Sequence, residues 1–453
     1  MAVVAIGTVM AVLDGSVANV ALPTIARELH ADAASSIWVV NAYQVVVAMM
    51  ILPFSSLGDA IGYRRVYAVG IALFTLGSLG CALSTTLLAL VLARVFQGVG
   101  GAAIMSIAPA LNRTIFPARM LGVAVGISAL TVASSSAAGP TIGGSILAVL
   151  PWPWLFAINV PLGIFDTAFA LRSLPRHPGT GGGIDLRSAA LSAPALAFFI
   201  MGLDGMARHF SPALTLALFA GSITAGIAFV RRQGAIPRPM LPLELFAQAR
   251  FSLAAATSLL SFVAQGLAFV VLPFLFQTVG GYSALASGLL FTPWPLAIAA
   301  IAPFSGRLSD RYPAPLLSTL GLATFCVGLG LLALLPVHPM PADIVWRTIV
   351  CGIGFGFFQA PNNRELLGSA PRQRSGSAAG VLATVRVTGQ SVGAAVVAVL
   401  LGAFAATSVA NALPNAAALD VPAHAALWTA AGCAAAACLV SAMRLRPAVP
   451  RIV

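Results

Sequence analysis

The amino-acid sequence predicts an all-α polytopic membrane protein. Of its 453 residues, 59% are hydrophobic and only 8% are charged, and the mean hydropathy is +0.97. A soluble domain cannot bury so much apolar surface, whereas a membrane protein exposes it to lipid. The apolar residues also fall into separate runs of about 20, the length that one helix needs to cross a bilayer. Composition and run length therefore predict the same fold class.

Fourteen apolar runs follow one another along the chain, and each is predicted to form a membrane-spanning helix. Polar or basic turns separate them. They cover residues 2–22, 37–57, 66–84, 87–110, 120–147, 153–172, 188–203, 213–230, 252–275, 286–304, 315–335, 344–362, 378–403 and 424–443. The seventh and eighth runs are short, so a chain of twelve spans is the alternative.

Two basic linkers bracket the seventh and eighth runs. The first is "RSLPRHPGTGGGIDLR" (172–187), and the second is "RRQGAIPRPMLPLELFAQAR" (231–250). Both are rich in Pro or Gly, as linkers are. This arrangement predicts six helices, an inserted pair and then six more helices.

The arginines predict the orientation of the chain. All 24 basic residues are Arg, and cytoplasmic loops of membrane proteins carry an excess of positive charge. With both termini in the cytoplasm, only Arg27, Arg208 and Arg347 fall on the outer side, while Arg94 and Arg386 lie inside spans. The net charge of +12 is thus interpreted as a topology signal, and no nucleic-acid partner is expected.

A repeated segment supports the division into two bundles. "LGDAIGYRR" (57–65) follows the second span, and "GRLSDRYP" (306–313) follows the second span of the last six. Internal repeats of this kind build many secondary transporters. The predicted domains are a bundle over 1–172, the linkers and inserted pair over 173–250, and a second bundle over 251–453.

Five motifs, each on the expected element, give the chain a family resemblance. It resembles the major facilitator superfamily, in particular the branch of fourteen-helix drug:proton antiporters. The motifs are "LDGSVANVALP" (13–23), "LGDAIGYRR" (57–65), "LARVFQGVGGA" (92–102), "AAGPTIGGS" (137–145) and "PWPWLFAINVPLG" (151–163). The chain departs from the family pattern at Ser55, Ala60 and Pro153, which weakens the charges of the loop after the second helix.

Asp14 and Arg94 are charges within apolar spans. Such charges are costly unless they are paired or face a polar cavity. An acid whose neighbours change between two conformations can bind a proton in one and release it in the other. The resemblance implies this coupling role for Asp14 and Arg94. The alternative is a fixed pair that only holds the first helix against the fourth.

Two further groups of residues are predicted to take part in transport. The resemblance implies a conformational latch formed by Asp59, Arg64 and Arg65, with a second copy at Asp310 and Arg311; the alternative is ordinary loop charges. It also implies an antiporter role for the kinked, closely packed helix that carries Gly139, Pro140, Gly143 and Gly144; the alternative is plain helix packing.

Polar residues within the spans are candidates for the lining of a substrate cavity. The alternative is that they form hydrogen bonds between helices. They are Asn19, Asn41, Tyr43, Gln44, Gln97, Gln265, Gln277, Gln359, Asn362, Asn363 and Arg386. Trp38 and Trp294 are expected to be interfacial anchors, and Asp166 is expected to be a helix-end residue.

The absence of certain motifs argues against several classes of function. The chain has no Lys, no HExxH and no CxxC among its five Cys, so no metal, cofactor or membrane-embedded enzyme activity is expected. No nucleotide-binding motif is present, which favours an ion gradient as the driving force.

The predicted function is proton-coupled efflux of lipophilic or cationic drugs across the bacterial cytoplasmic membrane. The alternative is a transporter of this family for one specific small solute. The expected partners are small-molecule substrates, protons and the lipid bilayer, and a monomer is expected.

Overall fold

The protein is described by a computed structural model that covers residues 2–116, 121–175, 185–207, 210–236, 239–241, 243–336, 339–370, 375–410 and 415–445. Within these ranges 14 helical segments are long and apolar enough to cross a membrane. The prediction of an all-α polytopic protein with fourteen spans is therefore confirmed. The loop residues Arg119, Arg176, His177, Arg238, Arg372, Arg374, Arg446 and Arg451 lie outside the described ranges.

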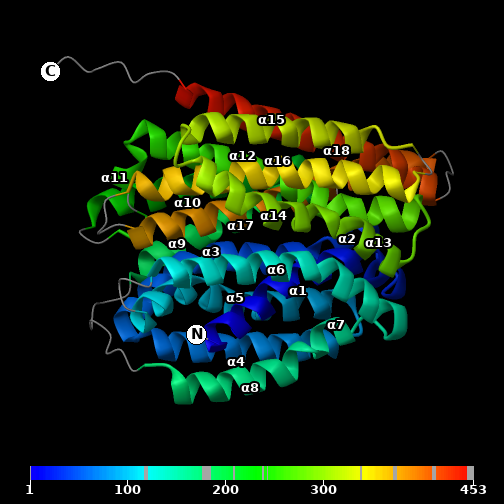
Figure 1. Cartoon of the computed structure of the whole chain (residues 1–453). Helices are drawn as coiled ribbons and strands as arrows, with labels where there is room; N and C mark the ends of the chain where they lie inside the picture. The colour runs from blue at the N-terminus through cyan, green and yellow to red at the C-terminus, as the bar shows by residue number, and fades with distance from the viewer. Residues whose placement is uncertain are drawn as a thin grey trace.

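The first six spans form one bundle, drawn in blue to cyan and blue-green in Figure 1. Two of its spans are broken near one end, the second between α2 and α3 and the sixth between α7 and α8. The elements are α1 (Ala2–Glu28), α2 (Ala33–Ser36), α3 (Trp38–Ile61), α4 (Tyr63–Ala82), α5 (Leu87–Ile115), α6 (Leu121–Val149), α7 (Trp154–Ala157) and α8 (Asn159–Ser173). Gly62, at φ +99°, permits the tight turn between α3 and α4, since a left-handed backbone favours glycine.

The last six spans form the second bundle, drawn in green to red on the other side of the molecule in Figure 1. The first of them ends in a π-helical turn, η2, and the second breaks between α13 and α14 at Thr292. The elements are α12 (Ala249–Phe274), η2 (Leu275–Val279), α13 (Ala284–Phe291), α14 (Pro293–Leu308), α15 (Ala314–Ala333), α16 (Pro341–Gly368), α17 (Ser375–Ala410), α18 (Asn415–Ala442) and η4 (Met443–Leu445).

The inserted pair consists of two full-length helices, so the alternative of twelve spans is wrong. These are α9 (Leu186–Ala207, 22 residues) and α10 (Pro212–Ala235, 24 residues), followed by the short α11 (Leu243–Phe246). The α9 helix packs against α3 of the first bundle and α17 of the second, while α10 packs on α9. Only Phe229 and Gln233 of α10 are buried, as expected for a helix that faces lipid.

The two ends of the molecule are distinguished here as the start face and the far face. The start face holds the beginning of α1 together with α11, and the far face holds α2, α7 and α13 (Figure 1). Three described hydrogen bonds join the two bundles, and all lie toward the far face. They are Asn41–Ser391, Gln277–Val20 and Thr141–Thr292.

Buried apolar side chains join the bundles at the same end. Val17, Ala21 and Ile25 of α1 belong to one cluster with Val263, Leu267 and Val271 of α12. Burial of apolar side chains from both bundles stabilises their contact. The far-face half of the interface is therefore closed in this structure.

Candidate functional site

A buried polar cluster lies within the first bundle, centred on Asp14 of α1 and Arg94 of α5. The two side chains form a salt bridge through Arg94 Nη1 and Asp14 Oδ2, and both have 0% relative exposure. Arg94 also donates from Nε to the carbonyl oxygen of Val39 at 2.7 Å. A buried ion pair is stable only when further hydrogen bonds satisfy its remaining atoms.

Gln97 provides several of these bonds, because it lies one helical turn after Arg94 on α5. Its Oε1 accepts from Arg94 Nη1 at 2.6 Å. Its Nε2 donates to Asp14 Oδ1 and to Ser78 Oγ, both at 2.8 Å. Asn159, the first residue of α8, donates to Asp14 Oδ1 at 3.3 Å. Side chains of α1, α4, α5 and α8 thus converge on one carboxylate.

The close approach of α4 to α5 depends on a glycine. A Cβ at Gly77 would lie 2.5 Å from Gln97 Cα and 2.7 Å from Gln97 N, well inside contact distance. Small residues let membrane helices approach at such distances. The absence of a side chain at Gly77 therefore allows Gln97 to reach Ser78 and Asp14.

Aromatic rings cover the guanidinium of Arg94. Its Cζ lies 4.4 Å from the ring centroid of Tyr43 and 5.5 Å from that of Phe156, within the range of cation–π attraction. Arg94 Nη2 has no hydrogen-bond partner among the described residues, so the rings are what this nitrogen meets. The cluster is closed to solvent, because the side chains of Asp14 and Arg94 are both fully buried.

The predicted latch residues of the first bundle lie at the start face. Asp59 accepts a hydrogen bond from Tyr63 Oη at 2.5 Å, and Arg64 donates to the carbonyl oxygen of Leu171 on α8. Arg65 is exposed.

In the second copy of the latch, the ion-pair partner of Asp310 is Arg364 of α16. The expected partners were the neighbouring arginines, including Arg311. The α16 helix places Arg364 beside Asp310 at the start face.

The glycines of the predicted antiporter helix, α6, make close contacts with both bundles. A Cβ at Gly139 would lie 2.4 Å from Ser16 Cβ on α1, and one at Gly143 would lie 3.3 Å from Val17 Cγ1. A Cβ at Gly144 would lie 2.7 Å from the carbonyl oxygen of Ala284 on α13. Pro140 meets α13 as well, because its carbonyl oxygen lies 2.2 Å from a Cβ built at Gly288.

The candidate cavity residues divide into two groups. Gln359 and Arg386 line a cavity of about 150 Å³ together with Asn363 and Phe262. Each of the other candidates either forms a hydrogen bond to another helix or has a side-chain atom without a described hydrogen-bond partner. Asn41, Gln97, Gln265, Gln277 and Asn362 form hydrogen bonds to other helices. Atoms of Asn19, Tyr43 and Gln44 have no partner among the described residues.

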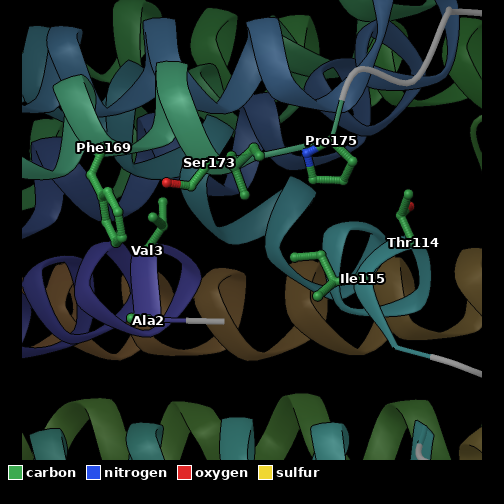
Figure 2. Close-up of a pocket in the computed structure, with 8 residues that line it drawn as sticks. Ala2, Val3, Thr114, Ile115, Phe169, Ser173 and Pro175 are labelled. Carbon is green, nitrogen blue, oxygen red and sulfur yellow. The ribbon is translucent and has the colours of Figure 1, made fainter.

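A larger cavity of about 370 Å³ opens at the start face of the first bundle. Figure 2 shows its labelled side chains, which come from the first turn of α1, the end of α5 and the end of α8. Val3 lines it, and the carbonyl oxygen of Val3 accepts a hydrogen bond from Tyr67 Oη at 3.1 Å. The described residues of its walls are apolar or uncharged.

Asp166 lies one turn from this cavity along α8, and the expectation that it is a helix-end residue is wrong. It sits within α8 and is 0% exposed. Neither carboxylate oxygen has a hydrogen-bond partner among the described residues. Its surroundings are the backbone of α1, where a Cβ at Gly7 would lie 3.3 Å from Asp166 Oδ2, and Tyr67 of α4.

One of the two tryptophans, Trp294, is placed differently from the expectation of an interfacial anchor. Trp294 is 0% exposed and packs against Phe269, Phe291 and Phe325 in the core of the second bundle. Trp38 donates from its indole nitrogen to Asp204 Oδ1 of α9 at 2.6 Å. Its role is to join α9 to the first bundle.

Ser78 and Asn159 are parts of the polar interior that the sequence analysis did not single out. Both are small polar residues in apolar helices, a signal too common to identify them, although Asn159 lies within the motif at 151–163. Asp166 was noticed as a charge in the sixth apolar run, but its burial was not predicted.

Comparison with known proteins shows what the chain is similar to. The family model described as "Major Facilitator Superfamily" matches residues 4–394. The uncharacterized transporter YebQ of Escherichia coli is 49% identical over 444 residues, covering 98% of this chain and 94% of the relative. The riboflavin transporter RibZ of Clostridioides difficile is 31% identical, covering 85% of this chain and 84% of the relative.

A multidrug efflux pump, LfrA of Mycolicibacterium smegmatis, is also 31% identical and covers 89% of this chain and 81% of the relative. Among solved structures, a bacterial homologue of the human lysosomal transporter Spinster, in an inward-facing and occupied conformation, aligns with a TM-score of 0.73. It has 13% sequence identity, covers 98% of this chain and 96% of its own, and so supports the fold alone. The chain belongs to the Major Facilitator Superfamily and is a multi-pass membrane transporter of that type.

Proposed function

We propose that the chain is a proton-coupled antiporter that exports lipophilic small molecules across the bacterial cytoplasmic membrane. The observation that carries the proposal is the sealed cluster of Asp14, Arg94 and Gln97. A charge pair at this depth is costly to maintain. It is understandable if a second conformation exchanges the salt bridge of Asp14 for contact with water, because the carboxylate then takes up a proton.

The packing of the two bundles supports alternating access. The hydrogen bonds between them lie toward the far face, where the buried apolar cluster also joins them. By the distribution of arginines, the start face is the cytoplasmic one. The structure then corresponds to a state closed to the outside, with the termini in the cytoplasm. In this proposal Asp59, Arg64, Arg65, Asp310 and Arg311 belong to a latch at the cytoplasmic face.

In the proposed transport cycle the two bundles, the inserted unit and α6 have separate roles. Residues 1–172 and 251–453 are the two moving bundles, and residues 173–250 form the inserted unit between them. Gly139, Pro140, Gly143 and Gly144 give α6 close contact with both bundles, so that α6 limits which conformations are reached without a bound substrate or proton. Export of toxic compounds, and hence antibiotic resistance, is supported by efflux pumps such as LfrA among the relatives.

A second candidate is a transporter dedicated to one small solute. The likeness to RibZ, whose name gives riboflavin as its substrate, favours this reading. The two candidates share the fold and the proton-coupling cluster and differ in the range of compounds carried.

The test uses inverted membrane vesicles that contain the protein and carry an imposed pH gradient. A panel of lipophilic cations, neutral compounds and acids is added, and collapse of the gradient reports proton movement coupled to transport. Asp14→Asn is compared with the parent and with Asp32→Asn, a matched control because Asp32 caps α2 at the far face and Asn caps helices equally well.

We expect several compounds to collapse the gradient in the parent and in Asp32→Asn, and none to do so in Asp14→Asn. Equal collapse in all three proteins would make Asp14 a structural residue and refute the coupling role. A response to a single compound or to none, with the protein present in the membrane, would favour the dedicated transporter.

A further inference from the structure

Arg386 is a cation without a partner in the second bundle. It is half-buried on α17, within the start-face half of the span 378–403. No salt bridge or hydrogen bond joins it to any described residue. An uncompensated charge inside a membrane protein has a high energetic cost. Such groups face a polar cavity or bind a ligand.

The acids of the second bundle are all engaged elsewhere. Residues 251–453 contain four of them, and each pairs with a different cation. The pairs are Asp310–Arg364, Asp343–Arg347, Glu365–Arg444 and Asp420–His424. In the first bundle, the carboxylate of Asp14 forms a salt bridge with Arg94. No carboxylate of the second bundle is therefore left to neutralise Arg386 in this conformation, and the carboxylate of Asp166, which has no described partner, lies in the first bundle on α8 beside α1.

The cavity at Arg386 has the composition of a binding site for an acidic group. Its volume is about 150 Å³, and its polar walls are Arg386, Gln359 and Asn363. The ring of Phe262 and three aliphatic side chains complete it. A cavity of about this volume accommodates a benzene-sized group. A guanidinium with two amides beside it supplies donors to a carboxylate, and the apolar wall can contact the ring or chain that carries the carboxylate.

The cavity lies where the two bundles meet. Ala379, Ala383 and Arg386 follow each other at helical spacing on α17, which packs along α3 of the first bundle. Ala383 contacts the apolar cluster of the first bundle, and a Cβ at Gly380 would lie 3.5 Å from Leu52 Cδ2 on α3. Transporters of this architecture bind their substrates near mid-membrane between the repeats.

We propose that Arg386, Gln359 and Asn363 bind the carboxylate of an acidic, lipophilic substrate. The inference rests on the proposed function, because it assigns a substrate class to that transport cycle. It shifts the expected cargo from cations to organic acids, since a lone guanidinium in the cavity repels a cationic group. Release of the bound acid would leave Arg386 unpaired again, as it is in this structure.

The test measures binding by thermal stabilisation of the purified full-length protein in detergent, without a proton gradient. The probes are benzoate, its neutral analogue benzamide, the cation benzylammonium, and chloride. The variants are Arg386→Gln, Arg386→Lys and the control Arg27→Gln, which removes an exposed positive charge at the far end of α1.

We expect benzoate to stabilise the parent and Arg27→Gln more than the other three probes do. Binding of benzoate should weaken about tenfold or more in Arg386→Gln, the loss expected for one charge-assisted bond, and be largely retained in Arg386→Lys. Equal stabilisation by benzoate and benzamide, or an unchanged response in Arg386→Gln, would overturn the proposal. Chloride acting as well as benzoate would assign the cavity to an inorganic anion and overturn it too.

Failure of this inference is distinguishable from failure of the proposed function. The binding assay does not involve proton movement, so a benzoate preference that persists in Asp14→Asn would leave the carboxylate site standing while coupling is tested separately. Conversely, neutral compounds or cations could collapse the pH gradient in an Asp14-dependent way while benzoate shows no binding preference. That result would support the antiporter and reject the carboxylate site.

Discussion

At the scale of single residues, the cluster around Asp14 explains why the first bundle tolerates two charges. The guanidinium of Arg94 suits this cluster for a geometric reason. Its Nε reaches the carbonyl oxygen of Val39, while Nη1 reaches both Asp14 and Gln97. A planar guanidinium can do this in several directions at once, whereas an ammonium is a single point charge. Neutralising one partner would leave the other charge buried and alone.

We therefore expect Arg94→Gln to destabilise the protein by about 3–5 kcal/mol, the usual cost of breaking a buried pair from one side. The double variant Asp14→Asn/Arg94→Gln should recover much of that loss, because neither charge then remains. Thermal unfolding of the purified proteins measures both effects in a double-mutant cycle. Additive losses in the double variant would mean that the pair is not coupled. Arg94→Lys, which keeps the charge, should fall between the parent and Arg94→Gln.

The charges within spans show how far prediction from sequence reaches. Asp14 and Arg94 stood out because each interrupts an apolar run, and their pairing follows from the cost of leaving either alone. Their hydrogen-bond partners Ser78 and Asn159 could not be predicted, since those contacts depend on the rotation of α4 and α8 about their axes. Trp294 could not be placed either. The preference of tryptophan for the membrane interface suggested an anchor, but Trp294 lies beside the break between α13 and α14 and packs in the aromatic core of the second bundle.

At the scale of elements, α6 is the helix whose packing most constrains the two bundles. Gly139 and Gly143 face α1 of the same bundle, and Gly144 faces α13 of the other. The contacts at Gly144 are with backbone atoms, the carbonyl oxygen of Ala284 and Leu285 Cα at 2.9 Å. Backbone cannot move aside as a flexible side chain can. A methyl group at Gly144 must therefore push α6 and α13 apart.

Gly144→Ala should lower thermal stability by about 1–3 kcal/mol, the usual cost of overpacking, and reduce transport. Gly15→Ala on α1 is the matched control, because a Cβ there meets nothing within 4 Å and alanine favours a helix over glycine. Thermal unfolding and vesicle transport are measured for both. An unchanged Gly144→Ala protein would show that α6 and α13 are not in close contact in the membrane.

The inserted pair is held at the start face by a small polar network. Asp185, just before α9, accepts from Arg232 Nη2 of α10 at 2.7 Å and from Arg232 Nε at 3.2 Å. Gln233 donates to Ser188 Oγ at 2.7 Å. The hydrogen bond from Arg232 lowers the pKa of Asp185 to about 2. Since an unperturbed Asp has a pKa of about 3.9, this contribution to folding is present above about pH 4 and is lost as the pH falls toward 2.

Asp185→Asn should therefore loosen the start-face end of α10 at neutral pH. In the parent protein the same helix end should loosen only near pH 2–4, where Asp185 becomes protonated. The effect will be modest, because the pair is only partly buried and solvent screens it. Hydrogen–deuterium exchange of the backbone amides near Arg232 measures it. Asp343→Asn, which alters an exposed pair at the other end of the molecule, is the control. Exchange that is equal in the parent and Asp185→Asn would show that the helix pair is held by apolar packing alone.

At the scale of the whole molecule, the bundles meet through few polar contacts, placed asymmetrically. The described hydrogen bonds between the bundles lie toward the far face, and none of them is an ion pair. Contacts between uncharged groups can be exchanged at modest cost, since each contributes only about 1 kcal/mol net. The sequence predicted two bundles from a repeated loop motif, but which end is closed depends on small differences between conformations and could not be predicted.

If the bundles must separate at the far face during transport, a covalent link there will stop the cycle. Thr141 of α6 and Thr292 between α13 and α14 are suited to this, since their Oγ1 atoms lie 2.6 Å apart and cysteine sulfurs at those positions are within reach of a disulfide. Thr141→Cys/Thr292→Cys should cross-link under oxidation and lose transport to the level of Asp14→Asn. A reductant should restore it. The two single variants control for the five native cysteines, all free in this structure. Complete cross-linking with undiminished transport would mean that the far face does not open, and that the two bundles do not alternate about this contact.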